Sequence, residues 1–452
     1  MRKKIIFLLC CLIIAGLPLA ALDKAFGQIT DDSELRRSIK ESWFMESPVK
    51  VLLQPGAVHR LAGGGRVELR AEAANDEFMI ILARELVNTA NGNNAVSGHF
   101  PGWAQGSWIL TRNLDTGAAV RIRIFPRSDP YTYIQFRPFG TDRSYMDVVL
   151  YDAYFVRSLP LPVSLERLYT MPLNDALKLA GNKFPLKYFE PNPADYSAKR
   201  NFISAVRNLL PGLNFADDGA IDQNGNYVYI NTGALQTGEA GLNCSGFAKW
   251  LIDGILRPVT GERLAIPPLK QPFGSRGSSF TDVWEELRDP FFGLDWIRNL
   301  ASQAWTTLRS AEFAGLEEFE VRDEPFSRII VRKGRESSVQ HYPAFLQDAG
   351  YGTEGLLPLL YSLAINEPGR FYLAAVNNES GPPTTPDNLR GRPRLRQYFH
   401  VAALVPYFNE YGVFQVAVFE SAAETSINAF RNRYPGHCVS LVRIPIESAF
   451  SP

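Results

Sequence analysis

A single cysteine, Cys244, lies in the stretch GEAGLNCSGFAKWLIDGI (residues 238–255), between a glycine-rich loop and a segment with helical spacing. A thiol becomes a nucleophile when it ionises, and its usual pKa of about 8.5 falls at a helix N-terminus or beside a protonated histidine. The amides and dipole of the following helix favour negative charge there. The same amides can hold an oxyanion during acyl transfer. Ser245 and Gly246 follow directly, and Gly246 is small enough to let a substrate approach the backbone.

A thiol nucleophile needs a base, and histidine is the usual one. His400 opens the strand-like segment HVAALVPY in the same half of the chain as Cys244. A histidine at the start of a strand can point into a cleft formed with a neighbouring helix. The remaining histidines lie in the N-terminal half, in a connector and in a turn: His59, His99, His341 and His437. The sequence therefore favours His400 as the base.

The base in turn needs a polar group that orients its ring. The hairpin-like segment FHVAALVPYFNEYGVFQVAVFES offers Gln415 and Glu420, and Glu420 ends an otherwise apolar strand. A three-residue loop at 409–411 would place His400 opposite Glu420, whereas a loop of two or four residues would shift the register by one position. Both residues stay open as the third member.

Two other roles for Cys244 are open at this point. Of the four cysteines, Cys10 and Cys11 lie in the N-terminal apolar run, so Cys438 is the one disulfide partner left. A disulfide between Cys244 and Cys438 would prevent nucleophilic attack. A zinc site built from Cys244, His400 and Glu420 lacks the short ligand spacing typical of zinc. The sequence predicts neither a metal nor a cofactor.

The elements that must position these residues belong to an α+β domain. Alternating residues predict a strand at 227–230, and the spacing of apolar residues predicts a helix from Ser245 onward. Further strands are predicted at 370–377, 399–408, 413–421 and 438–446. An insertion at about 262–340 contains an apolar stripe from Leu294 to Leu308 at helical spacing. That stripe predicts a helix packed on the core or a lid over a substrate.

The first half of the chain has a different pattern. Short segments with β-branched and aromatic residues run from about 48 to 165 and predict a β-rich N-terminal domain at 28–165, with a sandwich or barrel-like fold. Helical spacing then predicts a connector at 166–224. The prediction for the whole chain is therefore two domains joined by helices.

The N-terminus has the pattern of a secretory signal peptide, predicted at 1–27. Three basic residues precede an apolar run from Ile5 to Leu17, which is shorter than the roughly 20 residues needed to span a bilayer. We expect a periplasmic or secreted protein without a transmembrane segment in the mature chain. Lys plus Arg and Asp plus Glu both number 47, and this balance gives no indication of nucleic-acid binding.

The segment LNCSGFAKWL resembles the DCSGF nucleophile motif of the NlpC-type papain-like cysteine peptidases. The resemblance covers about residues 225–450 and implies an NlpC-type domain at 225–452, in which the cysteine helix packs on an antiparallel sheet. GRFYLAAVN and HVAALV match the strands that follow the cysteine helix in that family. It implies Cys244 as nucleophile, His400 as base and Glu420 or Gln415 as the orienting residue. It also implies that Tyr229 lines the site.

The sequence differs from the family's usual pattern at several positions. Asn243 replaces the usual Asp before the cysteine, Ala402 replaces a usual Gly, and the insertion lengthens the gap between Cys244 and His400. Since the family mostly cleaves peptide bonds in peptidoglycan, the resemblance implies a secreted cysteine endopeptidase with an N-terminal wall- or partner-binding domain. Alternatives are an amidase or acyltransferase with another substrate, or a binding protein that retains the fold.

Overall fold

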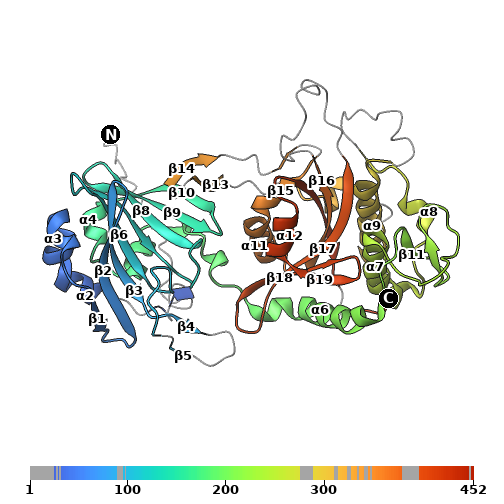
Figure 1. Ribbon diagram of the computed structural model, residues 1–452, viewed down its shortest axis with the longest axis horizontal. Coiled ribbons are helices and arrows are strands. Elements are labelled where there is room, and N and C mark those ends of the chain that lie inside the picture. Colours follow the sequence, from blue (N-terminus) through green and yellow to red (C-terminus); the bar gives the residue numbers. More distant parts are fainter. Residues whose placement is uncertain are drawn as a thin grey trace, which may run out of the picture. The chain divides into compact units, whose positions relative to one another are not determined.

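The structure is a computed structural model of the 452-residue chain. It describes residues 25–26, 29, 32–88, 95–96, 98–274, 289–309, 314–322, 327–332, 335–340, 345–346, 349–378, 397–446 and 449–452. The chain divides into two compact units, 1–190 and 191–452 (Figure 1). Most of the predicted signal peptide and the histidine His341 lie outside the described residues. Each unit is described by itself below.

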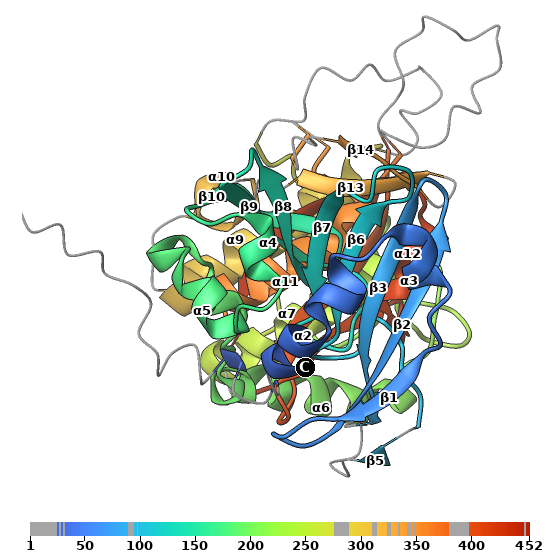
Figure 2. The ribbon, with the colours of Figure 1, turned by 90° about the vertical axis from the view of Figure 1, so that its left-hand side faces the viewer.

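The first unit contains an antiparallel meander in which each long strand pairs with its neighbours along the chain, in the order β1-β2-β3-β6-β7-β8-β9-β10 (Figure 2). A separate two-stranded ladder joins β4 and β5. The strands are β1 (Ala57–Arg60), β2 (Arg66–Ala74), β3 (Glu77–Arg84), β4 (Val87–Asn88), β5 (Ala95–Val96), β6 (Trp108–Asn113), β7 (Ala119–Ile124), β8 (Tyr133–Phe139), β9 (Arg143–Leu150) and β10 (Ala153–Leu161). A sandwich would need two facing sheets, and the strands β1–β3 and β6–β10 form one long meander instead.

Short helical segments accompany this sheet, and α4 packs against β7 and β8. The aromatic ring of Phe44 lies 5.1 Å from that of Trp108 on β6, which joins a helical segment to the buried side of the sheet. The segments are α2 (Ser33–Ile39), η1 (Lys40–Phe44), α3 (Pro48–Leu52), α4 (Leu165–Leu168), α5 (Leu173–Lys178), η2 (Gly181–Lys183) and η3 (Leu186–Tyr188). None of the helices in the described part of the chain combines the length and apolar character that a bilayer crossing requires.

The second unit is α+β and is organised around an antiparallel six-stranded sheet in the order β15-β20-β16-β17-β18-β19. Its strands are β15 (Tyr351–Gly352), β16 (Arg370–Asn377), β17 (Tyr398–Phe408), β18 (Phe414–Glu420), β19 (Ala423–Ser426) and β20 (Cys438–Pro445). The central strands β16, β17 and β20 are buried along most of their length. Both faces of the sheet are covered, and this explains why these strands have nearly continuous apolar sequences.

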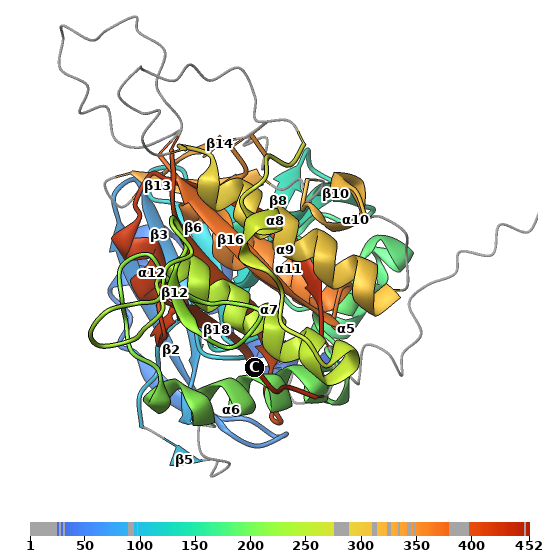
Figure 3. The same ribbon diagram turned by 90° about the vertical axis from the view of Figure 1, so that its right-hand side faces the viewer.

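Helices cover both faces of this sheet (Figures 1 and 3). On one face, α11 (Leu356–Asn366) and α12 (Ile427–Arg433) pack over a core that includes Leu404, Val418 and Leu441. On the other face, α7 (Cys244–Thr260) lies beside α9 (Phe292–Arg309), and α9 packs against β16, β17 and β20. The sequence prediction of a core-packed helix within the insertion is confirmed for α9, whose apolar stripe is buried.

The remaining elements of the second unit are short, except for α6 and the β13–β14 hairpin. They are η4 (Pro193–Tyr196), α6 (Ser197–Leu209), η5 (Leu210–Gly212), β11 (Gly219–Ile221), β12 (Tyr227–Tyr229), α8 (Ile266–Leu269), α10 (Leu316–Phe319), β13 (Ser327–Arg332), β14 (Arg335–Gln340) and η7 (Thr353–Gly355). Two of them bear on the site: β11 contacts the first turn of α7, and α8 packs against α9.

Candidate active site

Cys244 is the first residue of α7, the position that the sequence predicts. Asn243 caps the helix, because its extended backbone turns the chain and its Oδ1 accepts the Gly246 amide at 2.8 Å. Asparagine therefore provides the capping bond without placing a negative charge next to the thiol. The 17-residue helix directs its positive dipole end at Cys244.

The first turn of α7 packs backbone to backbone against β11, and this contact explains Gly246. A Cβ atom at position 246 would lie 1.9 Å from the Gly219 carbonyl oxygen and 2.9 Å from the Ala220 Cα. The space beside Gly246 is thus filled by the protein itself. Its small size serves packing, rather than the close approach of a substrate that the sequence suggested.

We expect Gly246→Ala to destabilise the second unit by about 1–3 kcal/mol or more, since the added methyl group meets main-chain atoms that cannot rotate away. Gly212→Ala is the matched control, because no atom lies within 4 Å of its added Cβ. Chemical unfolding followed by far-UV circular dichroism measures both variants. Equal stability of the two would contradict the packing argument.

His400 lies near the start of β17, and its Nε2 is 2.6 Å from Oε2 of Glu420 at the end of β18. The predicted register was wrong, because the hairpin loop has five residues (409–413) and Phe408 pairs with Phe414. Continuing this register places Glu420 opposite Ala402, so His400 and Glu420 are diagonal neighbours on one face. Both side chains are long enough to meet across that diagonal.

The second carboxylate oxygen of Glu420 accepts a hydrogen bond from Arg433, a residue that the sequence analysis did not identify. Arg433 Nη1 donates to Oε1 of Glu420, and the ring of the next residue, Tyr434, lies 5.5 Å from the His400 ring at an angle of 34°. Arg433 is the last residue of α12 and Tyr434 follows it, and α12 packs against β18 and β19. The end of α12 therefore contacts the acid and the imidazole together.

The electrostatics of the site favour a thiolate and an imidazolium. Burial disfavours the Cys244 thiolate, but the hydrogen bond and positive charge of His400 outweigh it and lower the pKa of the Cys244 thiol. Burial also disfavours the charged imidazole, but hydrogen bonds to Cys244 and Glu420 raise the pKa of His400 to about 9. Burial raises the pKa of Glu420, but His400 and Arg433 lower it overall. Glu420 is therefore ionised at neutral pH, and its charge supports the imidazolium.

These shifts predict how Cys244 reacts with iodoacetamide as the pH changes. The wild type is expected to be alkylated faster than free cysteine at pH 7, because the lowered pKa of the thiol leaves more thiolate. His400→Asn removes the cation that stabilises the thiolate, so the rate profile should move to higher pH. Mass spectrometry of the Cys244 peptide after timed labelling measures the rates. A profile that His400→Asn leaves in place would contradict the ion pair.

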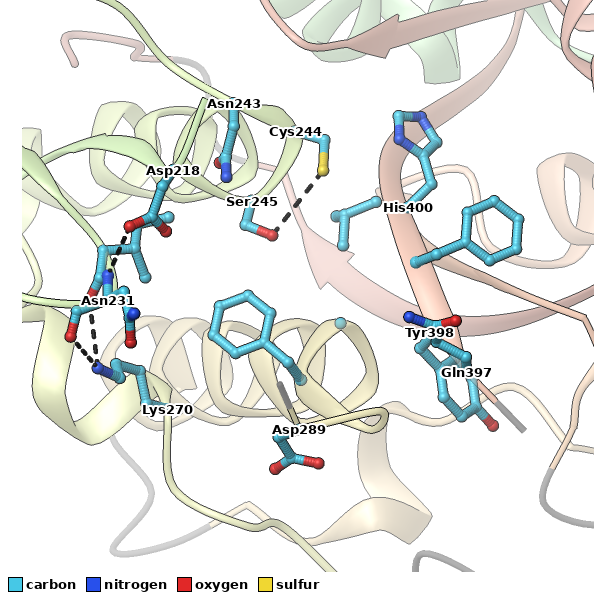
Figure 4. Close-up of a pocket in the computed structure, with 15 residues that line it drawn as sticks. Asp218, Asn231, Asn243, Cys244, Ser245, Lys270, Asp289, Gln397, Tyr398 and His400 are labelled. Carbon is cyan, nitrogen blue, oxygen red and sulfur yellow. Dashed lines mark hydrogen bonds between the residues drawn. The ribbon is translucent and has the colours of Figure 1, made fainter. Parts of the chain in front are cut away.

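Cys244 and His400 lie in the wall of a cavity of about 540 Å³ (Figure 4). The cavity is within the 300–1,000 Å³ range typical of small-ligand sites. Much of its remaining wall comes from two regions, the loop after β12 and the predicted insertion. They contribute Ile230, Asn231, Lys270, Asp289, Phe292 and Gly293, and Asp218 adds to the wall from the position before β11. The insertion therefore forms part of the site, although α9 packs on the sheet as a core helix.

Of the other predicted site residues, Ser245 lines the cavity and Tyr229 does not. Ser245 is buried in the cavity wall with its Oγ 3.9 Å from the Cys244 sulfur, and its carbonyl accepts the indole N–H of Trp296. Tyr229 is outside the lining, and its hydroxyl contacts Thr237 at 3.5 Å.

The structure bears on the alternatives that the sequence left open for the third residue and for the role of the thiol. Gln415 accepts a hydrogen bond from the Tyr407 hydroxyl at 2.5 Å, whereas Glu420 contacts His400. No disulfide joins Cys244 and Cys438, which are both described, and Cys438 is buried in β20. Within the described residues, no three His, Cys, Asp or Glu side chains are grouped as metal ligands would be.

Comparison with known proteins gives a match for the first unit. A family described as a domain of unknown function (DUF8515) matches residues 25–188, which is less than half of the chain. No curated protein and no solved structure matches the chain. The first unit is therefore similar to a family without an assigned function, and the match ends before β11 and α7, the elements that hold Cys244.

Proposed function

We propose that the second unit is an NlpC-type papain-like cysteine peptidase domain that hydrolyses an amide bond through a thioacyl intermediate. The observation that carries this proposal is that Cys244 and His400 line one cavity, while His400 Nε2 lies 2.6 Å from the Glu420 carboxylate. A nucleophile, a base and a group that orients the base are the parts that covalent acyl transfer requires.

The reaction follows from the protonation states. The Cys244 thiolate attacks the amide carbonyl carbon, a sulfur–carbon bond forms, and the oxygen gains negative charge near the N-terminal amides of α7. The His400 imidazolium gives its proton to the departing nitrogen as the carbon–nitrogen bond breaks. The neutral imidazole then takes a proton from water, whose oxygen attacks the thioester and releases the acid and the thiol.

The imidazolium is needed for departure of the amine, and this predicts the pH dependence. As the pH rises through about 9, His400 loses the proton that the leaving nitrogen needs, and the rate falls. Glu420 holds Nε2, which leaves Nδ1 for the thiol. The ring is thus kept in the orientation and charge state that the first step uses.

The substrate that we propose is the peptide part of peptidoglycan, and the first unit would then hold the enzyme on the cell wall. The signal-peptide pattern at 1–27 and the resemblance of LNCSGFAKWL to the NlpC motif support this substrate and an exported location. The cavity volume of about 540 Å³ suits a short peptide. A second observation, that the insertion supplies part of the cavity wall, favours the alternative of an NlpC-like amidase or acyltransferase with another substrate.

Digestion of purified peptidoglycan tests the proposal. The wild-type protein is incubated with peptidoglycan and, separately, with soluble muropeptides, and the products are identified by mass. New amino and carboxyl ends within the stem peptides are the expected result. Intact stem peptides after digestion, with a Cys244 thiol that reacts with iodoacetamide, would leave the thiol chemistry in place and exclude this substrate.

Arg433 is expected to act as a positioning residue for this reaction. Arg433→Met should lower kcat/KM about two- to fivefold, because the Arg433 side chain is 48% exposed and such ion pairs contribute modestly. Since Arg433 helps to lower the pKa of Glu420, its loss raises that pKa and moves the acid limb of the pH profile to higher pH. Arg433→Lys should restore the limb, and exposed Asn432→Ala is the control. An unchanged acid limb would limit Arg433 to a structural role.

A further inference from the structure

A lysine from the insertion lies in the wall of the same cavity as the nucleophile. Lys270 follows directly after α8, and its Nζ donates to the carbonyl oxygens of Ile230 at 3.2 Å and Asn231 at 3.0 Å (Figure 4). Two backbone acceptors on one strand end fix the ammonium group in place. An ammonium has three donors, so one N–H is left for a further acceptor.

The positive charge of Lys270 has no acidic partner among the described residues, since its contacts there are two neutral carbonyls. Two carboxylates do line the cavity, but each accepts from a backbone amide. Asp218 accepts the Asn231 amide at 3.0 Å, and Asp289 accepts the Phe291 amide at 2.9 Å. Lys270 is thus a fixed cation in the cavity wall that forms no salt bridge with a described residue, while Asp218 and Asp289 place negative charge elsewhere in the same wall.

We propose that Lys270 is a specificity residue that binds a carboxylate of the substrate while Cys244 attacks the amide. This inference rests on the proposed function, and it adds the substrate class: an amide that carries a free carboxylate near the bond that is cut. A charged hydrogen bond from the third N–H of Lys270 to a carboxylate oxygen would supply the salt-bridge partner that no described side chain provides. Stem peptides whose glutamyl residue has a free carboxylate belong to this class, and their amidated forms do not.

Pairs of thiol reagents test the charge preference without a need for turnover. N-bromoacetyl derivatives of glycine, β-alanine and γ-aminobutyrate carry the carboxylate at increasing distance from the reactive carbon, and each has a neutral carboxamide twin. Cys244 displaces bromide and forms a sulfur–carbon bond in every case, so only the charge differs within a pair. The ratio of the alkylation rates of acid and amide is measured by mass spectrometry for each length.

For at least one length, the acid should react faster than its amide in the wild type. Lys270→Met should lower that ratio about three- to fivefold, and Lys270→Arg should retain it. Asn299→Ala is the matched control, since Asn299 supports the same segment through the carbonyls of Leu269 and Gln271 without adding charge. This ratio is unaffected if Lys270 merely fixes the loop at 230–231, because a looser loop alters both reagents of a pair alike.

The inference is overturned if Lys270→Met leaves the ratio unchanged at every length, or if the amides react faster in the wild type because the two aspartates dominate. Digestion of free-acid and amidated stem peptides then separates this failure from a failure of the proposed function. Equal cleavage of both forms refutes the carboxylate preference and keeps the peptidase. Cleavage of neither form, with an intact acid-to-amide ratio at Cys244, refutes the peptidoglycan substrate and keeps the carboxylate preference.

Discussion

Replacing Cys244 with alanine is expected to abolish amide hydrolysis, with a fall in kcat of about 10⁴-fold or more, as for the loss of a covalent nucleophile. Cys244 is the first residue of α7 and lines the same cavity as His400, so its loss removes the proposed nucleophile from this site. The fold should persist, because Asn243 still caps the helix and Gly246 still packs on β11. Digestion of peptidoglycan, with products identified by mass, measures the loss.

The second described cysteine, Cys438, provides the control for this prediction. Cys438 is buried at the start of β20 and forms no disulfide with Cys244, so Cys438→Ala should retain hydrolysis. The unfolding midpoint of Cys244→Ala, measured by circular dichroism, should lie near that of the wild type. Undiminished cleavage by Cys244→Ala would refute the covalent mechanism, and equal losses in the two variants would assign the effect to folding.

Replacing Glu420 with glutamine is expected to lower kcat/KM by about 10²-fold or more, because an amide cannot stabilise the imidazolium as a carboxylate does. The shape of the side chain is kept, while the charge that helps to raise the pKa of His400 to about 9 is removed. The pKa of His400 should therefore fall, and the alkaline limb of the pH–rate profile should move to lower pH. A pH series of kcat/KM measures both effects.

Gln415 gives the matched control on the same strand. Its Oε1 accepts from the Tyr407 hydroxyl, away from His400, so Gln415→Ala should leave the rate and the alkaline limb near wild type. If Gln415→Ala causes the larger loss, the orienting role belongs to Gln415. If Glu420→Gln slows the reaction but leaves the alkaline limb in place, Glu420 does not support the charge of His400.

Local pattern was sufficient to predict many elements of the second unit. The predicted strand 370–377 coincides with β16, and the predicted helix start at Ser245 is one residue from the observed start of α7. Long apolar runs and a capping residue are properties of single segments, so they can be read without knowledge of the fold. The pairing of β17 with β18 depended on the length of the intervening loop, and the prediction of that length was wrong.

The parts of the site that the sequence did not reveal are tertiary contacts. Arg433 reaches Glu420 from α12, and Lys270 reaches the cavity from the insertion. Neither residue stands out in its own segment, because arginine and lysine are common on exposed surfaces. The role of Gly246 was also misjudged, since the strand β11 that packs against it is only three residues long and was not predicted.

The proposed reacting groups and much of the surrounding cavity wall come from different stretches of the chain. Cys244, His400 and Glu420 lie on α7 and on adjacent strands of the sheet, whereas Lys270, Asp289 and Phe292 belong to the insertion. Selection acting on the insertion can therefore change which molecules are accepted and leave the chemistry intact. The same division makes this segment a natural unit for exchange in chimeras, where a new preference would be acquired on an unaltered reaction centre.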